Sequence, residues 1–194
     1  MGAEENAEFR RRIDLVANNY NGILPHCMEF YLVQIRYMCE RCTSAFRRMR
    51  FALVWNEDPN EAFSSLQEAL IHAGALSRFF WPSSSAGDLG KRRGETLRRK
   101  LAVSDESPLR DRKLRNEMEH FDEMMDKYLV VADSGFFFPT PLVRSHHVAD
   151  SEIGHYFKLL DPVNNICVIL GRKYDYGQIE KEIRDISAQV STSF

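Results

Sequence analysis

Arg115, Asn116 and His120 bring three chemically useful side chains into six consecutive residues. A histidine titrates near neutral pH, so it can take a proton from a substrate and give it back. An arginine offers planar, permanently charged donors to a phosphate that gains negative charge during a reaction. The asparagine amide can hold a phosphate oxygen or fix the imidazole ring. Together the three groups are suited to chemistry at a phosphate.

The surrounding residues, 108–131, predict one long amphipathic helix that opens with a Ser-Pro start signal. Its apolar residues recur at alternating steps of four and three, at Leu114, Met118, Phe121, Met125 and Tyr128. In a continuous helix, Asn116 and His120 lie about 40° apart, whereas Arg115 and His120 lie about 140° apart. One copy of the helix therefore cannot aim both Arg115 and His120 at one atom. Two copies that face each other across a dimer can.

This part of the chain resembles the HEPN family, small helical domains many of which are metal-independent ribonucleases. The family motif of arginine, four to six residues and histidine falls on Arg115 and His120. The polar residue often found after the arginine falls on Asn116. The resemblance covers about residues 60–130 and is greatest to uncharacterised bacterial HEPN-like proteins. It includes the stretches 71–82, 93–98 and 107–123.

The resemblance implies a homodimer with the two motifs facing each other. Such a dimer cleaves RNA by attack of the ribose 2′-OH on the adjacent phosphate, without a metal or a cofactor. A toxin or defence effector with this activity would have a separate antitoxin or regulatory chain as its partner. Arg115 would then stabilise the phosphorane, His120 would move the proton, and Asn116 would position the phosphate.

Other residues are candidates for supporting this site. We expect Glu119, His72, Ser77 and Arg78 to surround the motif, with Glu68 placed to orient the His72 imidazole. The alternative for all of them is an ordinary helix surface, on which Arg115 and Glu119 form a solvated ion pair one turn apart. His120, beside the apolar stripe, would then be a core histidine.

A basic cluster precedes the motif and is the candidate RNA-binding surface. It consists of Lys91, Arg92, Arg93, Arg98, Arg99 and Lys100. On a short helix these charges would cover most of the surface and could follow an RNA backbone. A solvated helix surface explains them equally well. The formal net charge of −2 predicts no general attraction to polyanions, although residues 1–102 hold a small basic excess.

The pattern of the whole chain predicts a mainly α fold. Residues 1–133 form a bundle of about five helices, expected at 4–17, 25–56, 59–80, 88–102 and 108–131. Residues 134–194 add an extended segment over the bundle from Phe136, a β-hairpin with strands near 155–160 and 166–170, and a C-terminal helix packed on the bundle. No segment has the length of a membrane span or the build of a signal peptide, so we expect a cytoplasmic protein.

The cysteine spacing does not predict a metal site, and two further functions remain open. Cys39 and Cys42 supply only half of a zinc site, so we expect buried thiols and no metal. The second function is a non-catalytic HEPN-like dimer that binds RNA, a nucleotide or a protein. The third is a structural or regulatory dimer whose hairpin docks another protein.

Overall fold

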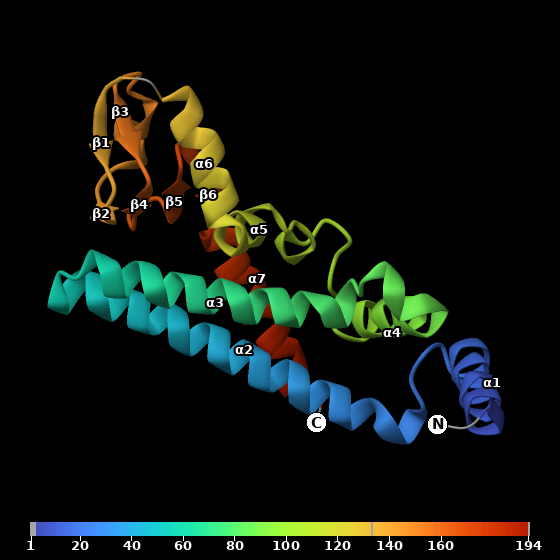
Figure 1. Ribbon diagram of the computed structural model, residues 1–194. Coiled ribbons are helices and arrows are strands. Elements are labelled where there is room, and N and C mark those ends of the chain that lie inside the picture. The colour runs from blue at the N-terminus through green and yellow to red at the C-terminus, as the bar shows by residue number, and fades with distance from the viewer. Residues whose placement is uncertain (1–2, 133, 194) are drawn as a thin grey trace.

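The structure is a computed structural model, which describes residues 3–132 and 134–193 apart from the side chains of residues 3 and 115. It is mainly helical, with a small β region and a C-terminal helix (Figure 1), as the sequence pattern predicted. The α-helices of the described residues are α1 (Ala3–Asn19), α2 (Met28–Phe51), α3 (Pro59–Phe80), α4 (Gly87–Lys100), α5 (Lys113–Glu119), α6 (Phe121–Val131) and α7 (Gly177–Ser191). None of these helices is both long and apolar enough to cross a membrane.

The antiparallel pair of α2 and α3 forms the long axis of the molecule (Figure 1). A π-helical turn, Ala52–Asn56, ends α2, and Glu57 then takes a left-handed conformation with φ of 50°. Asp58 begins α3: its carboxylate accepts hydrogen bonds from the Asn60 and Glu61 backbone N–H groups at 2.9 and 3.1 Å. These contacts satisfy donors that every helix start leaves open.

The C-terminal helix α7 packs against α2 and belongs to the same core. The Tyr176 ring, just before α7, stacks on Phe46 of α2 with 6.2 Å between ring centroids. Arg50 of α2 holds both carboxylate oxygens of Glu180, which is buried. One continuous apolar cluster thus includes residues of α2, α3, α7 and the strands.

The predicted hairpin is present as β4 (Lys158–Asp161) and β5 (Ile166–Ile169), which pair antiparallel. The sheet is larger than predicted, because β6 (Arg172–Asp175) pairs antiparallel with β5 and β2 (Leu142–Val143) pairs parallel with β4. The strand order is β2-β4-β5-β6. The charged start of β6, at Arg172 and Lys173, hid it from a search for apolar alternation.

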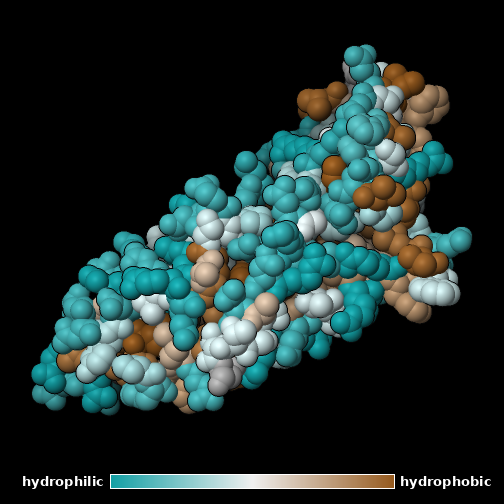
Figure 2. All heavy atoms as spheres, turned by 180° about the vertical axis from the view of Figure 1, so that it is seen from behind, coloured by the Kyte–Doolittle hydropathy of each residue, from teal (hydrophilic) through white to brown (hydrophobic). Residues whose placement is uncertain are grey.

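The extended segment at Phe136 has a partner that the sequence pattern did not predict. Residues Phe136–Phe138 form β1, which pairs parallel with β3 (Gly154–Tyr156). Aromatic stacking holds the pair together, with centroid distances of 4.6 Å for Phe137 and His155 and 4.7 Å for Phe138 and Tyr156. Figure 2 shows hydrophobic side chains gathered at this β end of the molecule, whereas much of the helical surface is hydrophilic.

The single long helix expected over 108–131 is wrong. A 3-10 turn, Pro108–Arg110, comes first, and the helix then divides into α5 and α6 at His120, whose φ and ψ are −113° and 35°. The two parts pack on different partners: Leu114 of α5 is buried beside α3, whereas Tyr128 of α6 contacts Phe157 and His155 of the β region. Periodicity continues across the break, so it could not reveal the change of direction.

Asp161 organises the turn between β4 and β5 and the 3-10 turn His146–Asp150. Its carboxylate accepts hydrogen bonds from the Val163 and Asn164 backbone N–H groups at 3.1 and 3.2 Å and from the Asn164 amide at 2.9 Å. It also accepts from the His146 backbone N–H at 2.9 Å, and the His146 ring Nδ1 lies 2.7 Å away. Burial alone would raise the pKa of Asp161, but the bonds from Asn164 and His146 lower it below its ordinary value.

Replacement of Asp161 with asparagine should lower the free energy of unfolding at pH 7 by about 1.5 kcal/mol, because the charged acceptor is lost. The folded-state pKa of Asp161 lies below the unfolded one, so its contribution is present above about pH 4 and is lost as the pH falls below that value. Urea unfolding between pH 3 and 7 checks this. The difference between the wild type and Asp161→Asn should shrink toward pH 3; a constant difference would contradict it.

Candidate functional site

The central motif lies where α5 ends and α6 begins. Arg115 and Asn116 are on α5, and the His120 backbone N–H donates to the Asn116 carbonyl at 2.9 Å. The carbonyl of His120 in turn accepts from Met124 at 3.1 Å, so this residue closes one helix and opens the next. Its side chain is 61% exposed, and its Nδ1 lies 3.7 Å from Glu123 Oε1. The imidazole is therefore a surface group and not the core histidine of the alternative interpretation.

The break changes the geometric argument for Arg115 and His120. Angles for a continuous helix do not extend past a residue with the backbone conformation of His120. The side chain of Arg115 lies outside the described residues. Asn116 and Glu119 are both exposed on α5, and each takes part in an interaction. Among the described groups, a helix end and the Glu123 carboxylate lie beside the imidazole.

A buried acid directly below the motif went unnoticed in the sequence. Glu117 is only 8% exposed, and its Oε1 accepts a hydrogen bond from Arg172 of β6. Burial first, and then the negative charge of Glu117, raises the pKa of Tyr174 to about 12. The signal was available, because Glu117 follows Leu114 by three residues and precedes Phe121 by four, which places it on the apolar face. It anchors α5 to the β sheet.

His72 and Glu68 lie on α3 with Arg48 of α2, apart from the motif. Arg48 binds the Glu68 carboxylate, and His72 Nε2 lies 3.6 Å from Glu68 Oε1. The hydrogen bond from Arg48 is the largest cause that lowers the pKa of Glu68 below its ordinary value. The α3 residues that face α5 are different ones: Leu70, Gly74 and Ser77 line a small cavity with Leu114.

Ser77 therefore does approach the start of α5, but its chemistry is already used. It is buried, and its hydroxyl donates to the Gly74 carbonyl at 2.9 Å. Arg78 is exposed, and its carbonyl accepts a hydrogen bond from the Arg93 guanidinium at 3.0 Å. Neither side chain contacts the described residues of the motif through a hydrogen bond or ion pair.

Part of the basic cluster serves the fold. The end of α3 leaves backbone carbonyls without helical partners, and arginines bind them. Arg93 donates to the carbonyl of Arg78 at 3.0 Å, Arg98 to that of Phe80 at 2.5 Å, and Arg112 to that of Trp81 at 2.8 Å. Arg98 also pairs with Asp105 at 3.0 Å. Arg93 and Arg98, which were predicted to bind RNA, thus bind backbone carbonyls of α3, and the side-chain pattern does not reveal such acceptors.

The rest of the cluster remains on the surface of α4. Lys91, Arg99 and Lys100 are exposed and Arg92 is half-buried. Lys91 lies 3.6 Å from Asp88, a weak surface pair. In the described part of the chain, Arg92, Arg99 and Lys100 make no ion pair. These three side chains, together with Lys91, are what the cluster offers to an RNA backbone.

Replacement of Arg98 with alanine should lower the free energy of unfolding by about 1.5 kcal/mol. The side chain is 19% exposed, bonds the end of α3 and covers the Trp81 ring at 5.6 Å. Arg99 is one residue further on α4 and fully on the surface, so Arg99→Ala is the matched control and should change stability by less than about 0.5 kcal/mol. Thermal and urea unfolding measure both. Equal effects of the two substitutions would show that Arg98 does not hold α3.

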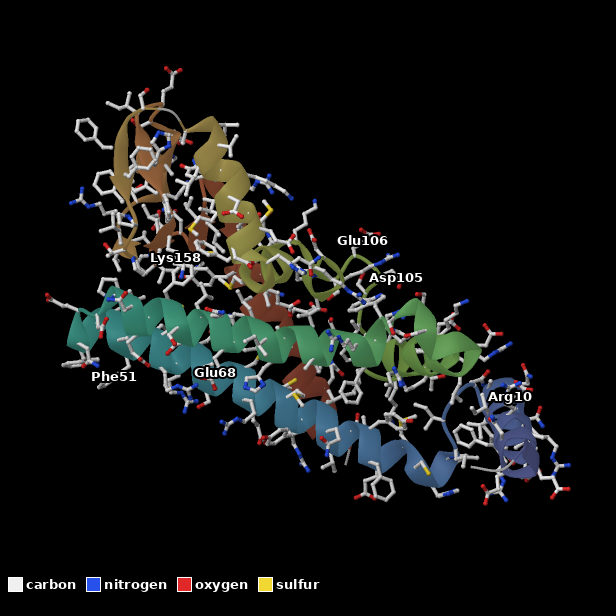
Figure 3. All side chains as sticks on the ribbon, viewed as in Figure 1. Arg10, Phe51, Glu68, Asp105, Glu106 and Lys158 are labelled. Carbon is white, nitrogen blue, oxygen red and sulfur yellow. The ribbon has the colours of Figure 1, made fainter. Side chains whose placement is uncertain are left out.

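An open groove of about 640 Å³ lies beside the start of α5, between residues 105–114 and 173–179. Asp105 and Glu106, in the chain between α4 and α5, line it (Figure 3). Its polar groups are largely engaged: Asp111 accepts from the Lys113 N–H at 2.9 Å, and Asp175 accepts from Gly177 at 2.8 Å. Acids and bases alternate along it, so the groove itself does not favour a polyanion.

Metal chemistry finds no ligand set in the described residues, since no group of three or more His, Cys, Asp or Glu side chains there could hold an ion. Cys39 and Cys42 are buried in α2, and burial raises the pKa of Cys39 to about 12.

No protein-family model matches the chain, and no curated protein or solved structure is significantly similar to it. The HEPN resemblance therefore rests on the sequence motif.

Proposed function

We propose that this chain is a metal-independent endoribonuclease of HEPN type, which acts as a homodimer. The observation that carries the proposal is the position of His120. Its imidazole is exposed at a helix break, one turn after Asn116, and His120 is the histidine of the motif that begins at Arg115. One chain presents this imidazole beside acidic groups. A facing copy would supply Arg115, the cation that the reaction needs.

In this proposal His120 takes the proton from the ribose 2′-OH, whose oxygen attacks the adjacent phosphorus. The protonated imidazole gives this proton to the 5′-oxygen of the next nucleotide, which leaves, and the product carries a 2′,3′-cyclic phosphate. Arg115 of the facing copy donates to the phosphorane oxygens as their charge grows, and Asn116 positions the phosphate. Glu123, at 3.7 Å from His120 Nδ1, is close enough to orient the ring. A toxin or defence effector, controlled by a separate chain, would fit this activity.

A non-catalytic binding module is the second candidate, and the hydrogen bonds of two arginines favour it. Arg93 and Arg98 bind carbonyls at the end of α3, so fewer cations of α4 are available to an RNA than its sequence predicts. A protein, a nucleotide or a short RNA is then a better partner than long RNA. Binding without turnover that is lost in Arg99→Ala and Lys100→Ala, but kept in His120→Ala, would favour this candidate.

The direct experiment incubates the purified protein with mixed single-stranded RNA in EDTA. Cleavage with 2′,3′-cyclic phosphate ends is expected, and it should be lost in Arg115→Ala and in His120→Ala. Absence of cleavage by the wild type, or equal cleavage by these variants, would overturn the catalytic proposal.

A further inference from the structure

Helix α2 carries an outward stripe that is symmetric about its own centre. Ser44 stands in the middle. On one side lie Glu40, Tyr37 and Val33, at steps of four, three and four; on the other lie Arg48, Phe51 and Trp55, at the same steps. These steps keep the six side chains from Val33 to Phe51 on one face of α2. Trp55 follows in the π-helical turn Ala52–Asn56, where its ring lies beside that of Phe51. Each aromatic or apolar residue has an apolar counterpart, and the acid has a base as its counterpart.

The stripe faces away from the core. Val33, Tyr37, Phe51 and Trp55 expose between 38% and 74% of their surface. The opposite face of α2, with Ile35, Cys39, Cys42 and Phe46, is fully buried. Figure 3 shows Phe51 at the end of α2, on the side away from the β region. The π-helical turn keeps Trp55 beside Phe51, with 6.5 Å between their ring centroids.

We infer that a second copy of this chain docks on this stripe, with the two α2 helices antiparallel and a two-fold axis at Ser44. A two-fold interface requires that one surface be complementary to itself. In this alignment Glu40 meets the partner's Arg48, Tyr37 meets the partner's Phe51, and Val33 meets the partner's Trp55. The small Ser44 side chains meet on the axis and let the helices approach closely. The contact extends along about 27 Å of α2, from Val33 to Phe51, and continues to Trp55 in the π-helical turn.

Charge selects this alignment over the parallel one. A parallel pair would place Glu40 on Glu40 and Arg48 on Arg48, which is repulsive. The antiparallel pair places opposite charges together twice. Glu40 is exposed and forms no ion pair with another described residue. Arg48 is already held by Glu68 and by the Ser44 hydroxyl at 3.2 Å, so its guanidinium is ordered before the partner arrives.

This interface is separate from the proposed composite site. Figure 1 places α5 and α6 on the other side of α3 from α2. Pairing through α2 therefore leaves Arg115 and His120 on the outer surfaces of the pair. A protein that makes both contacts assembles beyond a dimer. Self-association that the stripe substitutions leave unchanged, in a protein that cleaves RNA, would reject this inference alone. Pairing through α2 in a protein that does not cleave RNA would reject the composite site alone.

The first test is cross-linking on the axis. Ser44→Cys, in a Cys27→Ser background that removes the half-buried thiol, should give mostly disulfide-linked dimer under mild oxidation. Ser64→Cys in the same background is the control, because Ser64 is exposed on α3 outside the stripe. Equal cross-linking of the two variants, or none at Ser44→Cys, would overturn the inference.

The second test reverses the charges, with sedimentation velocity as the readout. Glu40→Arg alone should weaken self-association at least about tenfold, because the introduced guanidinium would face the partner's Arg48. A chain with Arg48→Glu, and with Glu68→Gln to avoid repulsion inside the chain, should weaken it likewise. An equimolar mixture of the two should associate as well as the wild type, since both ion pairs form again. A mixture that remains monomeric would contradict the antiparallel pairing.

Discussion

Replacement of His120 with alanine is expected to reduce the rate of RNA cleavage at least about 100-fold, the usual contribution of a positioned acid–base group. The imidazole is 61% exposed, and His120 ends α5 through its backbone N–H, which alanine keeps. Removal of the imidazole should therefore change the free energy of unfolding by less than about 0.5 kcal/mol. Single-turnover cleavage of a labelled single-stranded RNA measures the rate, and urea unfolding measures the stability. A large loss of rate at constant stability is the signature of a catalytic residue.

His147→Ala is the matched control for this experiment. His147 is also an exposed histidine close to a carboxylate, with Nδ1 3.5 Å from Asp150 Oδ2, but it lies in the β region. It should cleave RNA at the wild-type rate. If His120→Ala retains full activity, or if His147→Ala loses as much, the imidazole of His120 is not the acid–base group.

Replacement of Arg50 with alanine should lower the free energy of unfolding by about 3 kcal/mol. Arg50 binds both oxygens of Glu180, whose side chain is 9% exposed, so the substitution leaves a buried carboxylate with only Arg184, at 3.9 Å, as a partner among the described residues. The hydrogen bond with Glu180 also raises the pKa of Arg50 above its ordinary value. This pair joins α2 to α7, so its loss should loosen the C-terminal helix first.

Arg47→Ala provides the control for Arg50→Ala, because Arg47 is an exposed arginine one turn earlier on α2. It should change stability by less than about 0.5 kcal/mol. Hydrogen exchange should show α7 opening in the Arg50 variant and not in the Arg47 variant. Equal stabilities for the two variants would mean that α7 does not depend on the ion pair.

Sequence patterns located most helices because the relevant signals are local. Apolar residues at helical spacing predicted α2, α3 and α7, and the Asp58-Pro59 pair predicted the start of α3. The break at His120 left no such signal, since it depends on α5 packing on α3 while α6 packs on the β region. The pairing of β1 with β3 was also unpredictable, because it joins short segments through contacts that are distant in the sequence.

In the candidate site, too, local features could be predicted and contacts between distant residues could not. The sequence alone places Arg115, Asn116 and His120 in one motif. It did not predict that the His120 side chain is exposed, because the helix break at His120 was not predicted. The roles of Arg93 and Arg98 depend on carbonyls of α3 that are 15 and 18 residues earlier in the chain, and side-chain patterns do not report backbone acceptors. Glu117 differs, because an acid on the apolar face of a helix already predicts a buried charge with a partner.

Mixing two inactive variants tests the composite site most directly. Arg115→Ala and His120→Ala should each be inactive as homodimers. In a mixed dimer one site lacks both groups, while the other combines His120 of the first chain with Arg115 of the second. After co-expression at equal levels, about a quarter of the wild-type cleavage rate should return, because random pairing makes half of the dimers mixed and each mixed dimer has one intact site of two. A mixture that stays as inactive as its components would show that Arg115 and His120 do not act together across a dimer.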